Sequence, residues 1–279
     1  MMKKTEEDPI PRVIGDIDDP RRMMLTREEL EWALEVKELI ENTPELDNLP
    51  DMMYAQIAII TKGNHEDAFR RAWLLQEFRK EYNILDTFEE GLQMVTKLVE
   101  ILPLMLLSFS FSPSEGTFVV VNDMCKLNTT VLNTPRRVRM WMASSYYIHS
   151  ALSADVASIR RGCIAVVECE GMDWTKKQDF KLLQAMFSQL LTVYPFTGEF
   201  RGFHTGTIFN IMASTLRRIL PRHLKSMVQT GHTCEGRLDT FYLVPDVLSA
   251  NQRLISRVTS ALQMRYENER TFSLEPHQE

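Results

Sequence analysis

The sequence of 279 residues has an ordinary globular composition, which excludes a wholly disordered chain. Hydrophobic residues make up 44% of the chain and glycine is scarce, at 11 residues. The scarcity of glycine favours a helix-rich fold over a β-sandwich or barrel with glycine-rich turns. Lys and Arg number 32 against 38 Asp and Glu, so the net charge of −6 speaks against a general nucleic-acid binder, which needs a cationic surface.

The cysteines and the start of the chain indicate a reducing, intracellular setting. Cys125, Cys163, Cys169 and Cys234 include no C-x-x-C pair and no His partner at zinc-finger spacing, so we expect reduced thiols and no metal site. The first residues lack the apolar core of a secretory signal, and residues 101–111, the most apolar stretch, are too short for a membrane span. We therefore expect a cytoplasmic protein.

The first third of the chain is predicted to be helical. Residues 1–24 are charged and punctuated by proline, which predicts a mobile arm. Thr26 and Glu29 form a capping box, which predicts the start of a helix that ends near residue 42. Three further helices are expected: over 51–61, after Gly63-Asn64, and from Asp86, with Glu89 at the capping-box position.

Strands alternate with helices after Pro103. Residues 117–123 are rich in β-branched side chains, and residues 163–169 form a nearly continuous apolar run, which is typical of a sheet centre. Alternation with crossover helices predicts a mostly parallel sheet. The other expected elements are strands near 199–205 and 226–231 and helices from Thr134-Pro135, over 154–161, from Thr175, near 208–219 and over about 246–265.

No residue pattern argues for catalysis. The sequence contains no dinucleotide-binding fingerprint, P-loop, metalloprotease motif or nucleophile elbow. Glu168 and Glu170 share one strand face, and His204, His232 and Cys234 follow, but ordinary strand-end and loop contacts account for them better. We predict no catalytic residue, no cofactor and no metal.

Residues 208–220 combine an apolar helix with a cationic end. The segment is apolar over most of a helix circumference, and Arg217, Arg218, Arg222 and Lys225 lie within its end or just beyond it. Such a helix suits an anionic membrane surface, with its apolar face below the headgroups. The alternative is a core helix with a solvated basic end.

Five short motifs follow one another between residues 138 and 231: Ile164–Met172, Tyr194-Pro195, Phe203–Asn210, Leu216–Pro221 and Met227–Gly231. In this order and spacing, residues 138–231 resemble the lipid-binding domain of the CRAL-TRIO family. The resemblance implies an α/β fold, with a helical N-terminal lobe followed by a mixed, mostly parallel sheet flanked by helices and an apolar gating helix. The implied division is an arm over 1–24, a helical lobe over 25–102, a lipid-binding domain over 103–267 and a polar tail over 268–279.

The resemblance implies non-enzymatic binding of a small hydrophobic ligand, a lipid, with transfer or presentation at a membrane. Phe196 and Ser226 stand where phosphatidylinositol-handling members have Glu and Lys, so that headgroup is not expected. The implied pocket and gate residues are Trp141, Tyr147, Phe187, Phe203, Thr205, Phe209, Met212 and Leu216. The implied membrane-facing rim is Arg217, Arg218, Arg222 and Lys225. The expected partners are the ligand and a transient anionic membrane surface, with the protein as a monomer.

Two other functions are consistent with the same sequence. In the first, Trp141, Tyr147 and Phe187 fill the pocket and the protein is an interaction module that recruits a partner. In the second, Glu168, Glu170 or His204 faces the pocket of an enzyme that acts on a lipid. Lipid binding requires an apolar cavity of several hundred Å³, on the order of known ligand pockets, whereas an interaction module requires none.

Overall fold

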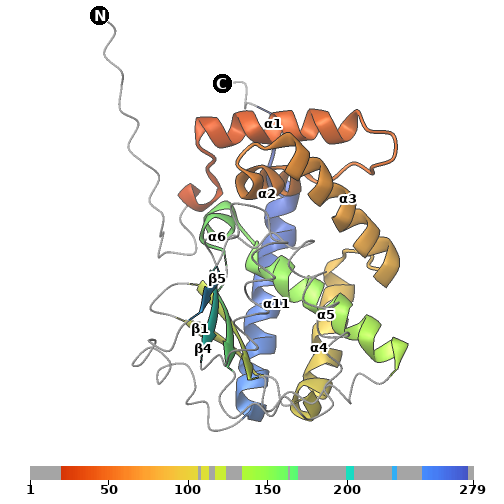
Figure 1. Cartoon of the computed structure of the whole chain (residues 1–279), viewed down its shortest axis with the longest axis vertical. Coiled ribbons are helices and arrows are strands. Elements are labelled where there is room, and N and C mark those ends of the chain that lie inside the picture. The colour runs from red at the N-terminus through yellow and green to blue at the C-terminus, as the bar shows by residue number, and fades with distance from the viewer. Residues whose placement is uncertain are drawn as a thin grey trace, which may run out of the picture.

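Helices form the body of the protein (Figure 1). The computed structural model describes residues 20–105, 108–112, 117–123, 134–162, 164–168, 199–203, 228–230 and 247–275. In these residues the helices are η1 (Pro20–Met23), α1 (Arg27–Glu41), α2 (Asp51–Thr61), α3 (His65–Tyr82), α4 (Phe88–Met105), α5 (Pro135–Leu152), α6 (Val156–Arg161) and α11 (Val247–Thr271).

Side-chain caps explain where several of these helices begin. The predicted capping box of α1 is confirmed, since the Thr26 hydroxyl accepts from the Glu29 amide at 3.1 Å and Glu29 Oε2 accepts from the Thr26 amide at 2.8 Å. Asn64 accepts from the Asp67 amide at 2.9 Å at the start of α3. Thr134 caps α5, in which Pro135 occupies the first turn, as predicted.

Most apolar side chains of these helices meet in one large core, and a smaller cluster packs Met52, Ile59 and Ile60 of α2 against Val156 and Ile159 of α6. Helix α2 contributes to both clusters, and nine of its eleven residues are buried. Side chains from α1, α3, α4, α5 and α11 belong to the large core, for example Val36, Phe78, Leu98, Tyr147 and Leu262. Residues from 33 to 274 therefore share one core.

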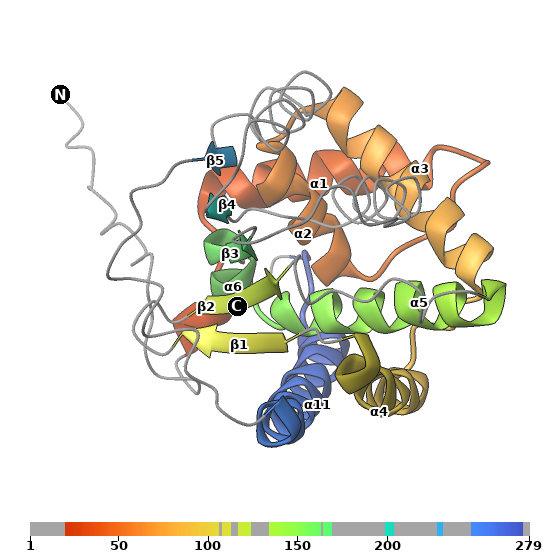
Figure 2. The same cartoon turned by 60° about the horizontal axis from the view of Figure 1, so that its bottom comes forward.

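Short strands lie beside this helical body (Figure 2). Their order in the sheet is β1 (Ser108–Ser112), β2 (Thr117–Asp123), β3 (Ile164–Glu168), β4 (Glu199–Phe203) and β5 (Val228–Thr230). Strand β1 is antiparallel to β2, and the later neighbours are parallel, with Val121 opposite Val166 and Val166 opposite Arg201. Strand β1 contacts α11.

The expected α/β fold class, a helical lobe followed by a mixed, mostly parallel sheet flanked by helices, is wrong. Among the residues whose side chains the structure describes, 77% are helical and none lies in a strand. Helices α5 and α11, which the alternating pattern assigned to the faces of a sheet, bury Tyr147 and Leu262 in the core shared with α1–α4. The sequence pattern identifies which face of a helix is apolar, but not whether that face meets a strand or another helix.

Several boundaries differ from those expected. Helix α4 continues to Met105, across the expected division at residues 102 and 103. Helix α11 continues to Thr271 instead of ending near 265, and Leu274 beyond it is buried. The expected gating helix, residues 208–220, lies outside the described residues. No helix in the described part of the chain is long and apolar enough to cross a bilayer.

The N-terminal turn and α6 are tied to the helical body by two ion pairs. Arg22 of η1 donates from Nη2 to Asp155 Oδ2 at 2.6 Å and from Nε to the same oxygen at 2.9 Å. Arg160 of α6 donates from Nε to Glu29 Oε1 at 2.7 Å. The end of the segment expected as a mobile arm is thus packed, because Arg22 is buried against α6.

Candidate functional site

A small cavity lies among α2, α3, α5 and α11. Its volume is about 30 Å³, which is room for about two water-sized groups. Its apolar lining residues are Met53, Ile57 and Ile60 from α2 and Leu75 from α3.

The cavity is also lined by polar side chains. They include two guanidinium groups, Arg71 of α3 and Arg265 of α11, each 4% exposed. Burial lowers the pKa of Arg71 to about 10, although the nearby Asp67 carboxylate raises it, so Arg71 stays charged at neutral pH. The neutral polar residues of the lining are Gln56, Tyr146, His149 and Ser150.

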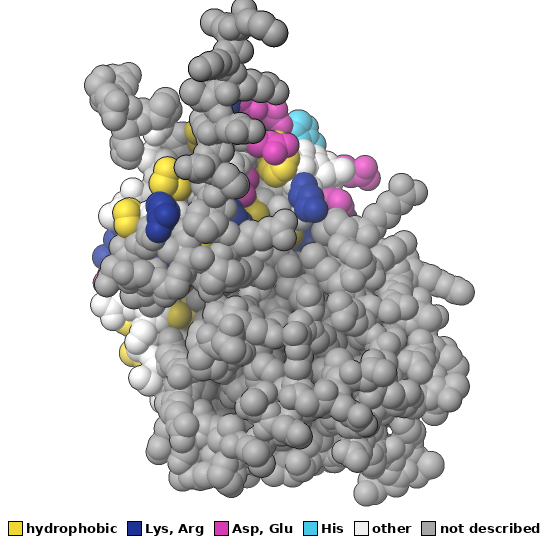
Figure 3. Space-filling view, turned by 90° about the vertical axis from the view of Figure 1, so that its left-hand side faces the viewer, with side chains coloured by type: hydrophobic (Ala, Val, Ile, Leu, Met, Phe, Trp, Pro, Cys, Tyr) yellow, Lys and Arg dark blue, Asp and Glu magenta, His cyan; other side chains and the backbone are white. Residues whose placement is uncertain are grey.

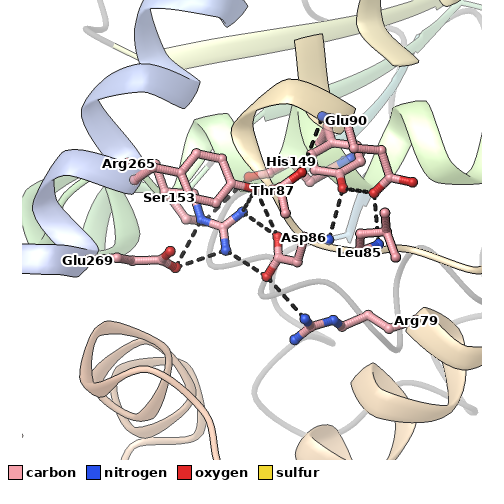
Figure 4. A network of polar contacts seen from close by, with 11 residues as sticks. Arg79, Leu85, Asp86, Thr87, Glu90, His149, Ser153, Arg265 and Glu269 are labelled. Atoms are coloured by element: carbon pink, nitrogen blue, oxygen red, sulfur yellow. Dashed lines mark hydrogen bonds and ion pairs between the residues drawn. The ribbon is translucent and has the colours of Figure 1, made fainter. Parts of the chain in front are cut away.

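Arg265 is held by an extensive ion-pair network (Figure 4). Its Nη1 and Nη2 donate to the two oxygens of Asp86 at 3.0 and 3.1 Å, and its Nε and Nη2 donate to Glu269 Oε1 at 3.1 and 2.8 Å. Nη1 also donates to the Tyr266 hydroxyl at 3.3 Å. Burial alone would lower the pKa of Arg265, but Asp86, Tyr146 and Glu269 raise it above its ordinary value. All five N–H groups of Arg265 therefore have acceptors.

His149 is a neutral hydrogen-bonding group in the lining of the cavity. Its Nδ1 lies 2.7 Å from the carbonyl oxygen of Ser145, which can only accept, so Nδ1 carries the ring proton. Burial lowers the pKa of His149 to about 4, which outweighs the opposing hydrogen bond. The imidazole is therefore uncharged at neutral pH, and the charge of the described lining comes from the guanidinium groups of Arg71 and Arg265.

Two predicted ligand-lining residues, Trp141 and Tyr147, lie in the helical core and are 7% and 0% exposed. The Tyr147 hydroxyl donates to Glu90 Oε2 and accepts from the Asp86 amide at 3.0 Å. Burial, followed by this contact with Glu90, raises the pKa of Tyr147. Tyr147 thus anchors the loop between α3 and α4, and neither residue is among the described side chains that line the cavity.

The other predicted site residues lie where the structure describes no side chains. Phe203 ends β4, which is described by its backbone alone. The pocket residues Phe187, Thr205, Phe209, Met212 and Leu216 and the rim residues Arg217, Arg218, Arg222 and Lys225 lie outside the described residues. Their predicted roles in binding the ligand and the membrane therefore stay predictions.

The sequence analysis missed both buried arginines of the cavity. Arg71 lies three positions after Ala68 and four before Leu75, on the buried stripe of α3. Arg265 lies three positions after Leu262, on the buried stripe of α11. A cation on an apolar stripe is the signal that could have identified each of them, because charged side chains are almost never fully buried without a compensating partner.

Acidic side chains gather at the end of the helical body where α1 lies. Figure 3 shows Asp and Glu in magenta at the top of its view, the end at which Figure 1 places α1. The exposed carboxylates of this helix are Glu28, Glu31, Glu35, Glu38 and Glu41. Such a surface repels anionic lipids, so we do not assign membrane contact to α1.

The comparisons with known proteins leave the family open. No family model matches this chain, and no curated protein matches it at a significant level. The resemblance to the CRAL-TRIO family therefore rests on the five motifs alone. Within the described residues, no three or more His, Cys, Asp or Glu side chains are grouped so that they could hold a metal ion.

Proposed function

We propose that the protein binds a hydrophobic small molecule of the lipid class without covalent chemistry and transfers or presents it at a membrane. The observation that carries this proposal is a cavity lined both by apolar side chains, such as Ile57, Ile60 and Leu75, and by polar ones, such as Arg71 and Tyr146. An amphiphile likewise has an apolar and a polar part. Its hydrocarbon gains about 0.8 kcal/mol for each buried methylene, and its polar end needs hydrogen-bonding partners.

The size of this cavity limits what it can hold. A volume of about 30 Å³ accepts the end of a ligand and not its whole body. In the proposal, the rest of the ligand is held by the pocket residues predicted from the sequence, from Phe187 to Leu216. Residues 208–220 act as the gate, because an apolar lid that opens at a bilayer spares the ligand from water.

Mass spectrometry under native conditions tests this proposal directly. The full chain is purified gently from its own cells, its intact mass is measured, and the bound material is then extracted into solvent. We expect a lipophilic molecule at a stoichiometric amount. A protein that is empty and also refuses a panel of fatty acids, sterols and phospholipids contradicts the proposal.

A substitution in the predicted gate tests how the ligand is retained. Met212→Asp places an uncompensated charge on the apolar stripe, and we expect it to reduce ligand retention and binding to vesicles. Met212→Leu is the matched control, because it keeps an apolar side chain of similar volume. Retention by a folded Met212→Asp variant at the level of the control removes the gate from the proposal.

The basic rim is tested separately from the pocket. Reversing the charges of Arg217, Arg218 and Arg222 to Glu is expected to weaken binding to anionic phosphatidylserine vesicles and to leave binding to neutral phosphatidylcholine vesicles unchanged. Wild-type binding to anionic vesicles should also weaken as salt rises. Binding that responds to neither change contradicts a membrane-facing rim.

The interaction module remains a second candidate because of one observation. Trp141 and Tyr147, which were predicted to line a ligand pocket, fill the helical core instead. Under this candidate the purified protein carries no lipid and binds none. The same mass-spectrometric experiment therefore separates the two functions.

A further inference from the structure

The exposed side of α3 carries two neighbouring aromatic side chains. Phe69 and Trp73 are 37% and 39% exposed, and their ring centroids lie 6.4 Å apart. They are separated by four positions, so both rings lie on one face of the helix. Tryptophan is among the residues that contribute most to binding at protein interfaces, and aromatic residues are enriched there. This aromatic pair therefore marks an interaction surface.

Two contacts place an acidic segment, residues 27–50, along the same side of α3. At the start of α3, His65 Nε2 lies 3.0 Å from Glu35 Oε2 of α1. Further along, Gln76 donates from Nε2 to the Asp47 carbonyl oxygen and accepts from the Asp47 amide, both at 2.8 Å. Positions 65, 69, 73 and 76 are successively three or four residues apart, so they share one side of the helix. The aromatic pair thus lies between the two points at which the acidic segment contacts α3.

The acidic segment has a large excess of negative charge. It contains eight carboxylates and two cations, and both cations are already paired with carboxylates. Glu35, Glu38 and Asp47 are among its exposed side chains. The exposed charges of α3 itself are of both signs, so the negative field beside the aromatic pair comes from the acidic segment. Such a field repels nucleic acids and anionic membranes and attracts a basic partner.

An arginine-rich peptide fits this combination of groups. Cations are attracted to carboxylates and also to the faces of aromatic rings, most strongly to that of tryptophan. The guanidinium of arginine can donate to both oxygens of a carboxylate and can stack on a ring. We propose that the face formed by Phe69, Trp73 and the acidic segment binds a short arginine-rich segment of another protein. This inference does not depend on the proposed lipid binding.

Fluorescence anisotropy with labelled peptides tests the inference on the full chain. Helix α1 has 15 residues and spans about 22 Å, so peptides of about eight extended residues are long enough. The first peptide alternates Arg with Ser, which places its cations on one side of the extended chain. The other peptides have Lys, Leu or Glu in place of Arg. We expect the Arg peptide to bind more tightly than the Lys peptide, and both to bind far more tightly than the Leu and Glu peptides.

Two sets of variants separate the aromatic from the acidic contribution. Trp73→Ala is expected to weaken binding of the Arg peptide about two- to fivefold, while Trp73→Phe retains part of that affinity. The double variant Glu35→Gln with Glu38→Gln should also weaken binding. Its matched control, Glu89→Gln with Glu267→Gln, removes two exposed carboxylates from α4 and α11 and should have a smaller effect.

The contrary outcomes identify another cause or another occupant. Binding that Trp73→Ala leaves unchanged, or that the control pair weakens as much as the pair on α1, reflects general charge attraction and overturns the proposal. Equal affinity for the Arg and Lys peptides overturns the choice of arginine, and equal affinity for the Leu peptide indicates an apolar partner instead. Dimers of the full chain that native mass spectrometry detects and that Trp73→Ala abolishes would assign the face to a second copy.

A measurement on the wild type covers the case in which Trp73→Ala does not fold. Hydroxyl radicals oxidise exposed side chains, so Phe69 and Trp73 should react in the free protein. A saturating amount of the Arg peptide should protect both, whereas Leu85, which is 70% exposed and precedes α4, should react as before. Oxidation of Phe69 and Trp73 that the peptide leaves unchanged contradicts the proposed face.

Discussion

Arg265 of α11 and Asp86, which precedes α4, form a two-point ion pair across 179 positions of sequence. The Nη2 atom of Arg79 in α3 lies 3.5 Å from Asp86 Oδ2. The Asp86 carboxylate therefore links α3 and α11 to the segment that precedes α4 (Figure 4). Burial would raise the pKa of Asp86, but Arg265 and Arg79 lower it below its ordinary value. This pair fixes the C-terminal helix to the rest of the body and sets one side of the cavity.

Removing the Asp86 carboxylate should destabilise the protein strongly. Asp86→Asn keeps the shape of the side chain but leaves the buried Arg265 charge with less compensation, and such changes cost about 3–5 kcal/mol. Urea denaturation measures the loss. Arg27→Gln removes an exposed ion pair with Glu31 on α1 and serves as the control, with an expected cost below about 1 kcal/mol. A cost for Asp86→Asn no larger than that of the control contradicts a stabilising role for the network.

Asp86 also shows where local sequence signals stop being informative. The sequence predicted that Asp86 opens a helix, with Glu89 in the capping box, but α4 begins at Phe88, and Thr87 accepts from the Glu90 amide at 3.3 Å. Asp86 instead has a positive φ of 55° and binds Arg265. A cap is a contact over three residues and can be predicted locally, whereas a partner 179 residues away depends on the whole packing.

The helix boundaries illustrate the same division. The predicted helix over 51–61 is confirmed as α2, and Asn64 and Thr134 cap α3 and α5, because these signals are carried by adjacent residues. Within the intervals expected as strands, 117–123 and 163–169, residues 119–123 pair in parallel with residues 164–168. The fold class was wrong because it depends on which apolar faces meet. The alternating pattern of strands and helices does not determine that α5 and α11 pack against α4.

Acid should destabilise the protein through His149 before it protonates most carboxylates. Burial lowers the pKa of folded His149 to about 4 from an ordinary value of 6.5, so the unfolded chain takes up a proton first as the pH falls. The stability that neutral His149 contributes is present above pH 6.5 and is lost as the pH falls from 6.5 to about 4. The loss is about 1.4 kcal/mol for each unit by which the pKa of His149 differs between the unfolded and folded chain. The free energy of unfolding, measured by urea denaturation across this range, should fall in the wild type.

The matched variant for this prediction is His149→Gln, which cannot gain a proton. Its free energy of unfolding should fall less over the same range. The difference between the two pH profiles isolates His149, because Glu269 is present in both proteins. The raised pKa of Glu269, caused mainly by burial, acts in the opposite direction near its own titration. Parallel pH profiles for the two proteins contradict a buried, neutral His149.

Two substitutions at the start of α1 distinguish the contribution of the helix cap from that of an ion pair. Thr26→Ala removes the hydroxyl that accepts from the Glu29 amide, and loss of such a cap costs about 1 kcal/mol. Glu29→Gln keeps a group able to accept from the Thr26 amide but removes the charge that binds Arg160 of α6. Thermal unfolding of both variants, with Thr26→Ser as the conservative control, measures the two contributions.

The two variants should also differ in their response to acid. Burial would raise the pKa of Glu29, but Arg160 and Thr26 lower it overall, so its contribution is present above the ordinary value of 4.5 and is lost as the pH falls below it. The Thr26→Ala variant should still lose most of this stability in acid, whereas the Glu29→Gln variant should not lose it. A Glu29→Gln variant that loses as much stability in acid as the wild type is the contradicting result.

Gly91 of α4 should tolerate no side chain, although it lies inside a helix. A Cβ at this position would lie 2.7 Å from Cδ1 of Tyr147 and 3.3 Å from Cδ1 of Leu262. The Tyr147 ring cannot move aside easily, because its hydroxyl is held by Glu90 and by the Asp86 amide. Overpacking costs about 1–3 kcal/mol and outweighs the gain of about 1 kcal/mol that alanine brings to a helix.

Gly91→Ala is therefore expected to lower the midpoint of urea denaturation, and a second substitution identifies the cause. In a Tyr147→Leu background the aromatic Cδ1 is gone, so the added methyl group should cost less than it does in the wild type. The difference between the two costs is the interaction energy between positions 91 and 147. A Gly91→Ala variant that is more stable than the wild type contradicts this packing, since the helix propensity of alanine would then act without opposition from Tyr147.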